Sequence, residues 1–210
     1  SENGWGSLRV FGELKKLGVR NVSRSTVVNI LREAHIDPGP KRGEGTWSEF
    51  VNRHAATLWA ADFISVRTLT ACGLVDLYLV FFIHIGSRKV IASAPTANPD
   101  SAWVAQQARN ASMQMADWNL SITHLIIDHD SKFTDSFDAV FEAEGAKILR
   151  VGPAAPNLSP HAERWVRTLR AECLDHFVIC GERHLQYLVT NYLAHYLEER
   201  PHQGVGNVPL

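Results

Sequence analysis

The sequence predicts an α/β fold: a mixed five-stranded sheet flanked by helices and preceded by a small helical segment. Two observations from residue 57 onward support this class. Short apolar runs bounded by turn residues come first and then alternate with longer segments of helical periodicity. The first three runs are joined by short connections, which favours an antiparallel meander. The resulting order, βββαβαβαα, indicates a single layered domain.

Residues 1–36 are predicted to form two helices with a break between them. Leucine and phenylalanine recur at every third position over residues 8–17, and Gly18 ends this pattern. A second helix follows, for which Ser23 or Ser25 provides the N-cap. This arrangement predicts a helix-turn-helix segment, and a simple helical hairpin is the alternative.

In the helix-turn-helix interpretation the second helix enters the major groove of DNA. Arg24 and Thr26 lie at its N-terminus and are the candidate DNA contacts, whereas apolar residues such as Ile30 are expected to face inward. Gly, Pro and a basic pair then predict a linker over residues 37–56. The remaining residues, 57–210, are expected to form the α/β domain.

Within this domain the first strand is apolar on both sides, as expected of a central strand. Asp100 or Asn98 is expected to cap the first helix, and Gly145 to follow the second. The predicted strands are 58–66, 74–83, 89–93, 124–128 and 146–151. The predicted helices are 100–118, 136–144, one that begins at Pro160, and 182–199.

Three acidic residues of this domain can be assigned to a place in a predicted strand or helix from the residues around them. Asp62 interrupts an apolar strand, where an unpaired carboxylate costs on the order of several kcal/mol. Asp128 ends an apolar run, which places it at the carboxyl end of a strand, the edge that usually carries the site in α/β sheets. Glu163 lies in the first turn of the helix that begins at Pro160, where the helix dipole favours a negative charge. We predict that these three carboxylates meet.

Three converging carboxylates suit hard divalent cations such as Mg²⁺ or Mn²⁺, which prefer oxygen ligands. Two such ions about 3.5–4 Å apart can activate a hydroxyl and stabilise the leaving oxygen of a displacement at phosphorus. The alternative is structural. Asp62 then pairs with an arginine, Asp128 caps a turn and Glu163 only complements the helix dipole.

The chain from Trp59 to Gln203 resembles the catalytic core of DDE transposases and retroviral-type integrases, especially the integrase-core transposases of bacterial insertion sequences. The matching pieces are Leu58–Phe63, Asp128–Thr134, His161–Arg164 and Glu198–Gln203. The resemblance implies an RNase H-like fold. It also implies that the preceding helices are the DNA-binding region of such a transposase.

By this resemblance Asp62, Asp128 and Glu163 hold two Mg²⁺ (or Mn²⁺) ions and catalyse DNA cleavage and strand transfer. The implied partners are element ends, target DNA and further copies of the chain, as a dimer or larger homo-oligomer. The implied location is the bacterial cytoplasm, in association with the nucleoid. The candidate phosphate contacts are Lys132, Arg164, Arg167 and Arg170, although a solvated helix face would also carry such residues.

Two residues depart from the family pattern. Asp130 stands where a Gly is common, and Lys132 stands where a Gln is usual. Asp130 is then a spectator, an extra metal ligand or a sign of drift in a decaying copy. Two other functions therefore stay open: a non-catalytic DNA-binding derivative, and an RNase H-like nuclease that cuts without joining.

Composition is that of a globular protein, with 45% hydrophobic and 20% charged residues. There is neither a secretory signal nor an apolar run near the ~20 residues of a membrane span, so we expect a cytoplasmic protein that does not enter membranes. The first residue is not Met, which suggests a fragment of a longer chain. The net charge is −1, but residues 1–53 carry more Lys and Arg than Asp and Glu. Cysteines are sparse and form no C-x-x-C pair, which argues against a zinc site.

Overall fold

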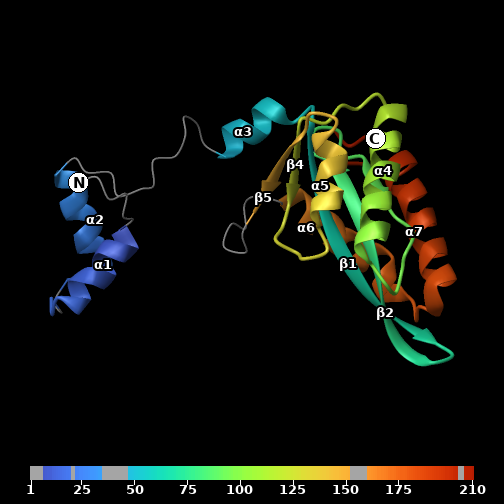
Figure 1. Cartoon of the computed structure of the whole chain (residues 1–210), viewed down its shortest axis with the longest axis horizontal. Coiled ribbons are helices and arrows are strands. Elements are labelled where there is room, and N and C mark those ends of the chain that lie inside the picture. Colours follow the sequence, from blue (N-terminus) through green and yellow to red (C-terminus); the bar gives the residue numbers. More distant parts are fainter. Residues whose placement is uncertain (1–6, 20–21, 35–46, 152–159, 203–205) are drawn as a thin grey trace. The chain divides into compact units, whose positions relative to one another are not determined.

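The computed structural model describes residues 7–19, 22–34, 47–151, 160–202 and 206–210. The chain divides into two compact units, Ser1–Glu49 and Phe50–Leu210 (Figure 1). Half of the predicted linker, residues 37–46, lies outside the described residues, and Trp47–His54 in the other half form a helix.

The first unit contains two described helices, α1 (Ser7–Lys16) and α2 (Arg24–Glu33). Gly18 has a left-handed backbone (φ 84°) just after α1, which ends this helix as expected. The hydroxyl of Ser23 accepts a hydrogen bond from the backbone N–H of Thr26 at 3.1 Å, so Ser23 caps α2. Val27 is buried, but Ile30 is 55% exposed. The expectation that Ile30 faces inward is therefore wrong within this unit, because it lies on the exposed side of α2.

The second unit is built on a five-stranded sheet in the order β3-β2-β1-β4-β5. Its strands are β1 (Leu58–Thr70), β2 (Gly73–His84), β3 (Val90–Ala92), β4 (His124–Ile127) and β5 (Lys147–Arg150). The first three strands pair antiparallel, whereas β1, β4 and β5 pair parallel. The mixed sheet predicted from the sequence is confirmed, and β1 is its central strand.

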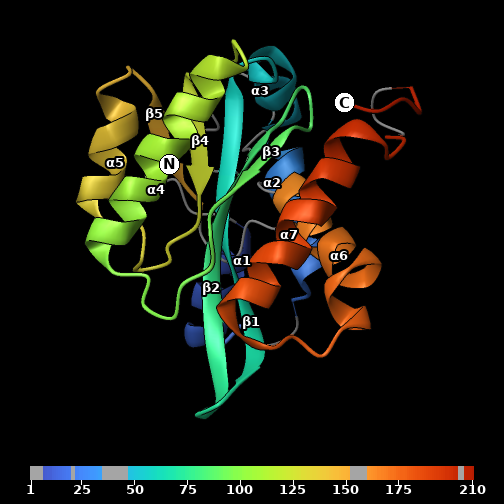
Figure 2. The ribbon, with the colours of Figure 1, turned by 90° about the vertical axis from the view of Figure 1, so that its right-hand side faces the viewer.

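Helices cover both faces of this sheet, with α4 and α5 on one face and α6 and α7 on the other (Figure 2). The bounds are α3 (Trp47–His54), α4 (Ser101–Asp117), α5 (Asp135–Glu142), α6 (Pro160–Glu172), the 3₁₀ turn η1 (Leu174–His176) and α7 (Gly181–Glu198). Asp100 caps α4 by accepting the backbone N–H of Trp103 at 2.8 Å. Within the described ranges, every helix is too short or too polar to cross a bilayer.

Alternation along β1 decides which way each side chain points. Trp59 and Ala61 belong to the apolar core beneath α4 and α5. Asp62 therefore points to the opposite face, where α6 lies. Its cross-strand partner is Phe81, whose ring centroid lies 4.4 Å from that of the buried Trp165 in α6. Asp62 is thus held beside α6 by the sheet itself.

Candidate active site

The register of the two parallel strands β1 and β4 brings two of the predicted acidic residues to one level. Ala60 pairs with Ile126. Asp62 and Asp128 each lie two residues beyond that pair, and Asp128 directly follows the end of β4. The two residues are therefore neighbours on adjacent strands, as expected from their positions in apolar runs.

Helix α6 brings Glu163 to the same level. The guanidinium of Arg170 donates a hydrogen bond to the carbonyl of Ser65 at 2.9 Å. Ile179 and Cys180, which follow α6, pair with Leu69 near the C-terminal end of β1. Helix α6 and strand β1 therefore run in the same direction. Glu163 lies about two turns before Arg170, about 10 Å along the helix, and Asp62 lies about 10 Å before Ser65 along the strand. Glu163 and Asp62 are consequently opposite each other.

The electrostatics of Asp62 agree with this arrangement of the acidic residues. The pKa of Asp62 is raised to about 6. Burial is the largest cause, whereas the backbone N–H of Phe63, which donates to its carboxylate at 2.7 Å, acts in the opposite direction. The charges of Asp128, Asp130 and Glu163 raise the pKa further.

The structural alternative holds for Asp128 but not for Asp62. Among the described residues Asp62, Asp128 and Glu163 form no ion pair, so Asp62 is not paired with an arginine. Asp128 does cap a turn, because its carboxylate accepts the backbone N–H of Asp130 at 2.9 Å.

The three carboxylates do not form a preassembled metal site. Within the described part of the chain, no three His, Cys, Asp or Glu side chains lie close enough to hold a metal ion. The mutual repulsion of ionised carboxylates opposes closer approach. The chemistry of the donors nevertheless fits a hard divalent cation, since all three offer only oxygen and none forms an ion pair with a cation of the described residues.

Asp130 and Lys132, the two residues that depart from the family pattern, form an ion pair with each other. The ammonium of Lys132 lies 2.6 Å from the carboxylate of Asp130, which also accepts the backbone N–H of Lys132 at 2.9 Å. The same ammonium lies 5.0 Å from the ring centroid of Phe63 and 5.5 Å from that of Tyr78. Phe133, which is buried, packs on Phe63 and anchors the loop. Asp130 and Lys132 therefore neutralise each other beside Asp62.

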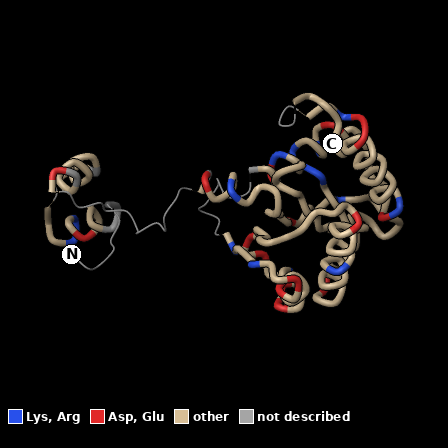
Figure 3. The backbone as a smooth tube through the Cα atoms, turned by 90° about the horizontal axis from the view of Figure 1, so that it is seen from above, with Lys and Arg blue, Asp and Glu red and all other residues tan. Residues whose placement is uncertain are grey.

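The other predicted DNA contacts differ in their exposure and in whether they already bind another residue of the chain. Arg167 is exposed and makes no ion pair or side-chain hydrogen bond among the described residues, whereas Arg170 attaches α6 to β1. Arg164 is exposed and also borders a cavity. Thr26 is exposed on α2, but the side chain of Arg24 lies outside the described residues. Lys and Arg are interspersed with Asp and Glu over the second unit (Figure 3).

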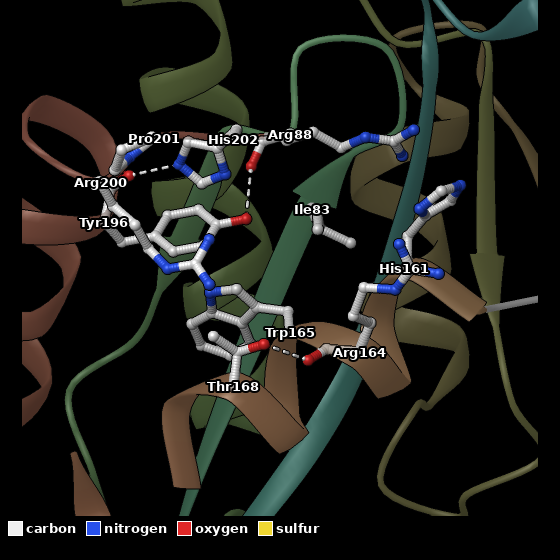
Figure 4. A pocket seen from close by; sticks show the side chains of 10 residues that line it. All are labelled: Ile83, Arg88, His161, Arg164, Trp165, Thr168, Tyr196, Arg200, Pro201 and His202. Carbon is white, nitrogen blue, oxygen red and sulfur yellow. Dashed lines mark hydrogen bonds between the residues drawn. The ribbon is translucent and has the colours of Figure 1, made fainter. Parts of the chain in front are cut away.

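The cavity contains residues that the sequence did not identify. Its volume is about 320 Å³, and it lies against α6, the turn after β2 and the chain after α7 (Figure 4). It is lined by Ile83, Arg88, His161, Arg164, Trp165, Thr168, Tyr196, Arg200, Pro201 and His202. In the sequence, the pieces His161–Arg164 and Glu198–Gln203 stood out through the family resemblance, whereas Arg88 had no distinguishing pattern. Trp165 is 2% exposed and therefore belongs to the core.

Comparison with known proteins agrees with this architecture. Residues 144–209 match the family model described as integrase core domain. The catalytic core domain of HTLV-2 integrase in complex with magnesium, in its dimeric form, superposes with a TM-score of 0.52 and 13% identity over 71% of this chain and 91% of that one. The trimeric form of the same domain gives a TM-score of 0.54 and 12% identity over 73% of this chain and 93% of that one.

The catalytic core domain of BIV integrase gives a TM-score of 0.50 and 16% identity over 69% of this chain and 86% of that one. No curated protein sequence matches the chain. The structural likeness confirms the RNase H-like fold, and the family match lies in the C-terminal part of the same unit.

Proposed function

We propose that the second unit is a catalytic core of the DDE integrase and transposase type, and that the chain catalyses metal-dependent DNA cleavage and strand transfer. One observation carries the proposal. Asp62 and Asp128 are level on adjacent parallel strands, Glu163 lies opposite on α6, and the charges of the latter two raise the pKa of Asp62. A structural role would leave this concentration of negative charge unexplained.

The proposed ligands of two divalent cations, Mg²⁺ or Mn²⁺, are Asp62, Asp128 and Glu163. The HTLV-2 integrase cores, described in complex with magnesium, support this choice. When bound, such ions activate the attacking hydroxyl and stabilise the leaving oxygen. With a pKa of about 6, Asp62 is mostly ionised at pH 7.5 and holds a proton at more acidic pH. Proton binding at Asp62 therefore competes with cation binding below about pH 6.

The proposed DNA contacts lie on two elements. Arg167 is exposed one turn after Glu163, and together with Arg164 it would position DNA through phosphates without reading bases. Arg24 and Thr26 at the start of α2 are the proposed major-groove contacts. Lys132 would contribute less, because Asp130 neutralises its charge. We also propose a homo-oligomer, since strand transfer joins two element ends to one target.

The test is a nicking and joining assay in Mn²⁺. The substrate is a labelled duplex that carries the sequences flanking the gene, with a supercoiled plasmid as the target. Asp62→Asn is compared with Asp117→Asn, a matched change at an exposed position of α4. Joined products that vanish only in Asp62→Asn would support the proposal.

Other outcomes favour the alternatives. Nicks without joined products would identify a nuclease that cuts without joining. DNA binding with no metal-dependent product, in the wild type as in Asp62→Asn, would favour a non-catalytic derivative of a transposase.

A further inference from the structure

Helix α6 carries a second set of polar side chains, on the flank away from Glu163. His161, Arg164 and Thr168 recur at helical spacing and line the cavity of Figure 4, whereas Glu163 and Arg167 share the other flank. The buried face of α6 lies between the two flanks. The cavity is therefore distinct from the three carboxylates but lies on the same helix.

The cavity holds two guanidiniums whose charge is not compensated. Arg200 forms a two-point ion pair with Glu172, with distances of 2.7 and 2.9 Å. Arg88 and Arg164, in contrast, form no ion pair among the described residues. The cavity is thus lined by two positive charges that no carboxylate of the described chain neutralises.

Two buried hydrogen-bond donors of the lining have no acceptor in the described chain. They are Nη1 of Arg88 and the indole N–H of Trp165. In folded proteins the great majority of buried polar groups form a hydrogen bond, so we expect a partner for each of these two donors. Because both groups only donate, their natural partner is a ligand that only accepts hydrogen bonds.

The charges of the lining also act on one another. The pKa of Arg88 is lowered, and burial is the largest cause. Tyr196 acts in the opposite direction, whereas the positive charge of Arg164 lowers the pKa of Arg88 further. An anion between these groups would relieve the repulsion.

The backbone holds Arg88 in an uncommon conformation. Its φ is 67°, in the left-handed region that non-glycine residues seldom adopt. Its carbonyl accepts a hydrogen bond from the hydroxyl of the buried Tyr196 at 3.4 Å. The turn after β2 and helix α7 together direct this arginine to the cavity.

We propose that this cavity binds a phosphate group, and that DNA supplies it at a position separate from the bond that is cut. Guanidiniums bind phosphates with paired N–H donors, and a volume of about 320 Å³ admits such a group. DNA is the favoured source because Arg164 directly follows Glu163 in α6. This choice of source rests on the proposed function, whereas phosphate binding itself does not.

The first test measures thermal unfolding in inorganic phosphate and in chloride at equal ionic strength and pH 7.5, without divalent cations. Arg88→Gln is compared with Arg109→Gln, which removes the same charge from an exposed position on α4. Phosphate should stabilise the wild type and Arg109→Gln, with about tenfold weaker affinity for Arg88→Gln, since a charge-assisted contact is lost. Equal stabilisation of all three would overturn the proposal.

The second test identifies the source of the phosphate through the salt dependence of binding to a short duplex. If DNA fills the cavity, Arg88→Gln should reduce the slope of log affinity against log salt by about 0.9 relative to Arg109→Gln. An unchanged slope, together with lost stabilisation by phosphate, would assign the site to free phosphate and reject DNA as its occupant.

Arg164→Gln provides a second variant in case Arg88→Gln does not unfold cooperatively, and it should lose the same stabilisation by phosphate. Neither test requires cleavage or a metal ion. A failure of the phosphate site is therefore distinguishable from a failure of the proposed activity.

Discussion

Asp62→Asn should stabilise the protein at neutral pH in the absence of divalent cations. A carboxylate whose pKa is raised from its ordinary value of 3.8 to about 6 destabilises the folded state when ionised. At about 1.36 kcal/mol per pKa unit, this corresponds to about 3 kcal/mol. Asparagine is uncharged and can still accept the N–H of Phe63. After about 1 kcal/mol for burying the amide, we expect a gain of about 2 kcal/mol.

The sign of the pH dependence follows from the same pKa. The folded state binds the proton of Asp62 more tightly than the unfolded state, so this contribution to stability is present below about pH 4. It is lost as the pH rises to about 6. The advantage of Asp62→Asn should therefore be absent near pH 4 and fully present above about pH 6.

Thermal and urea unfolding at pH 4.5 and 7.5 would measure this difference. A gain of about 2 kcal/mol corresponds to a rise in Tm of about 4–8 °C for a unit of this size. Asp117→Asn, at an exposed position, should stay within about 0.5 kcal/mol of the wild type at both pH values. Added Mn²⁺ should then stabilise the wild type and not Asp62→Asn. An Asp62→Asn variant that is less stable at pH 7.5 would refute the reasoning and make Asp62 a structural hydrogen-bond acceptor.

Four further predictions concern the helix and the loop of the site. Glu163→Gln should abolish cleavage and leave DNA binding largely intact in a gel-shift assay, because it removes a charge and little volume; equal loss of both would make Glu163 structural. Arg167→Ala should weaken binding to all sequences alike and reduce the salt slope by about 0.9, whereas sequence-selective loss would indicate base readout. A double-mutant cycle on Asp130 and Lys132 should give a coupling free energy of about 0.5–1 kcal/mol, and a coupling of zero would show that the two side chains do not stabilise each other. His161 should titrate near pH 4 by NMR and shift upward in phosphate, and an ordinary pKa would contradict its burial beside two arginines.

The three acidic residues of the candidate site could be selected from the sequence because each has a strong local context. A carboxylate in an apolar strand, as at Asp62, and one at the end of such a strand, as at Asp128, are visible without a structure. Glu163 is visible through the Pro160 that begins its helix. The three residues lie side by side because of the β1–β4 register and the direction of α6. No local sequence pattern indicates either of these two features.

Features that depend on distant contacts were not predictable. Strand β1 extends to Thr70, beyond the predicted end at residue 66, because its polar outer part pairs with β2 and carries the Arg67–Asp76 ion pair. The cavity joins a turn, a helix and a C-terminal segment, and the left-handed backbone at Arg88 is unusual for arginine. No local pattern indicates that such segments converge.

The two flanks of α6 have a thermodynamic consequence. Glu163 and Arg164 are adjacent residues of one 13-residue helix, so a displacement that moves one of them toward a ligand moves the other as well. Two ligands that favour the same position of a rigid element assist each other, and the assistance is reciprocal. The factor by which phosphate at Arg164 strengthens cation binding at Glu163 must equal the factor by which the cation strengthens phosphate binding. Helix α6 would then link capture of the DNA backbone to assembly of the catalytic carboxylates.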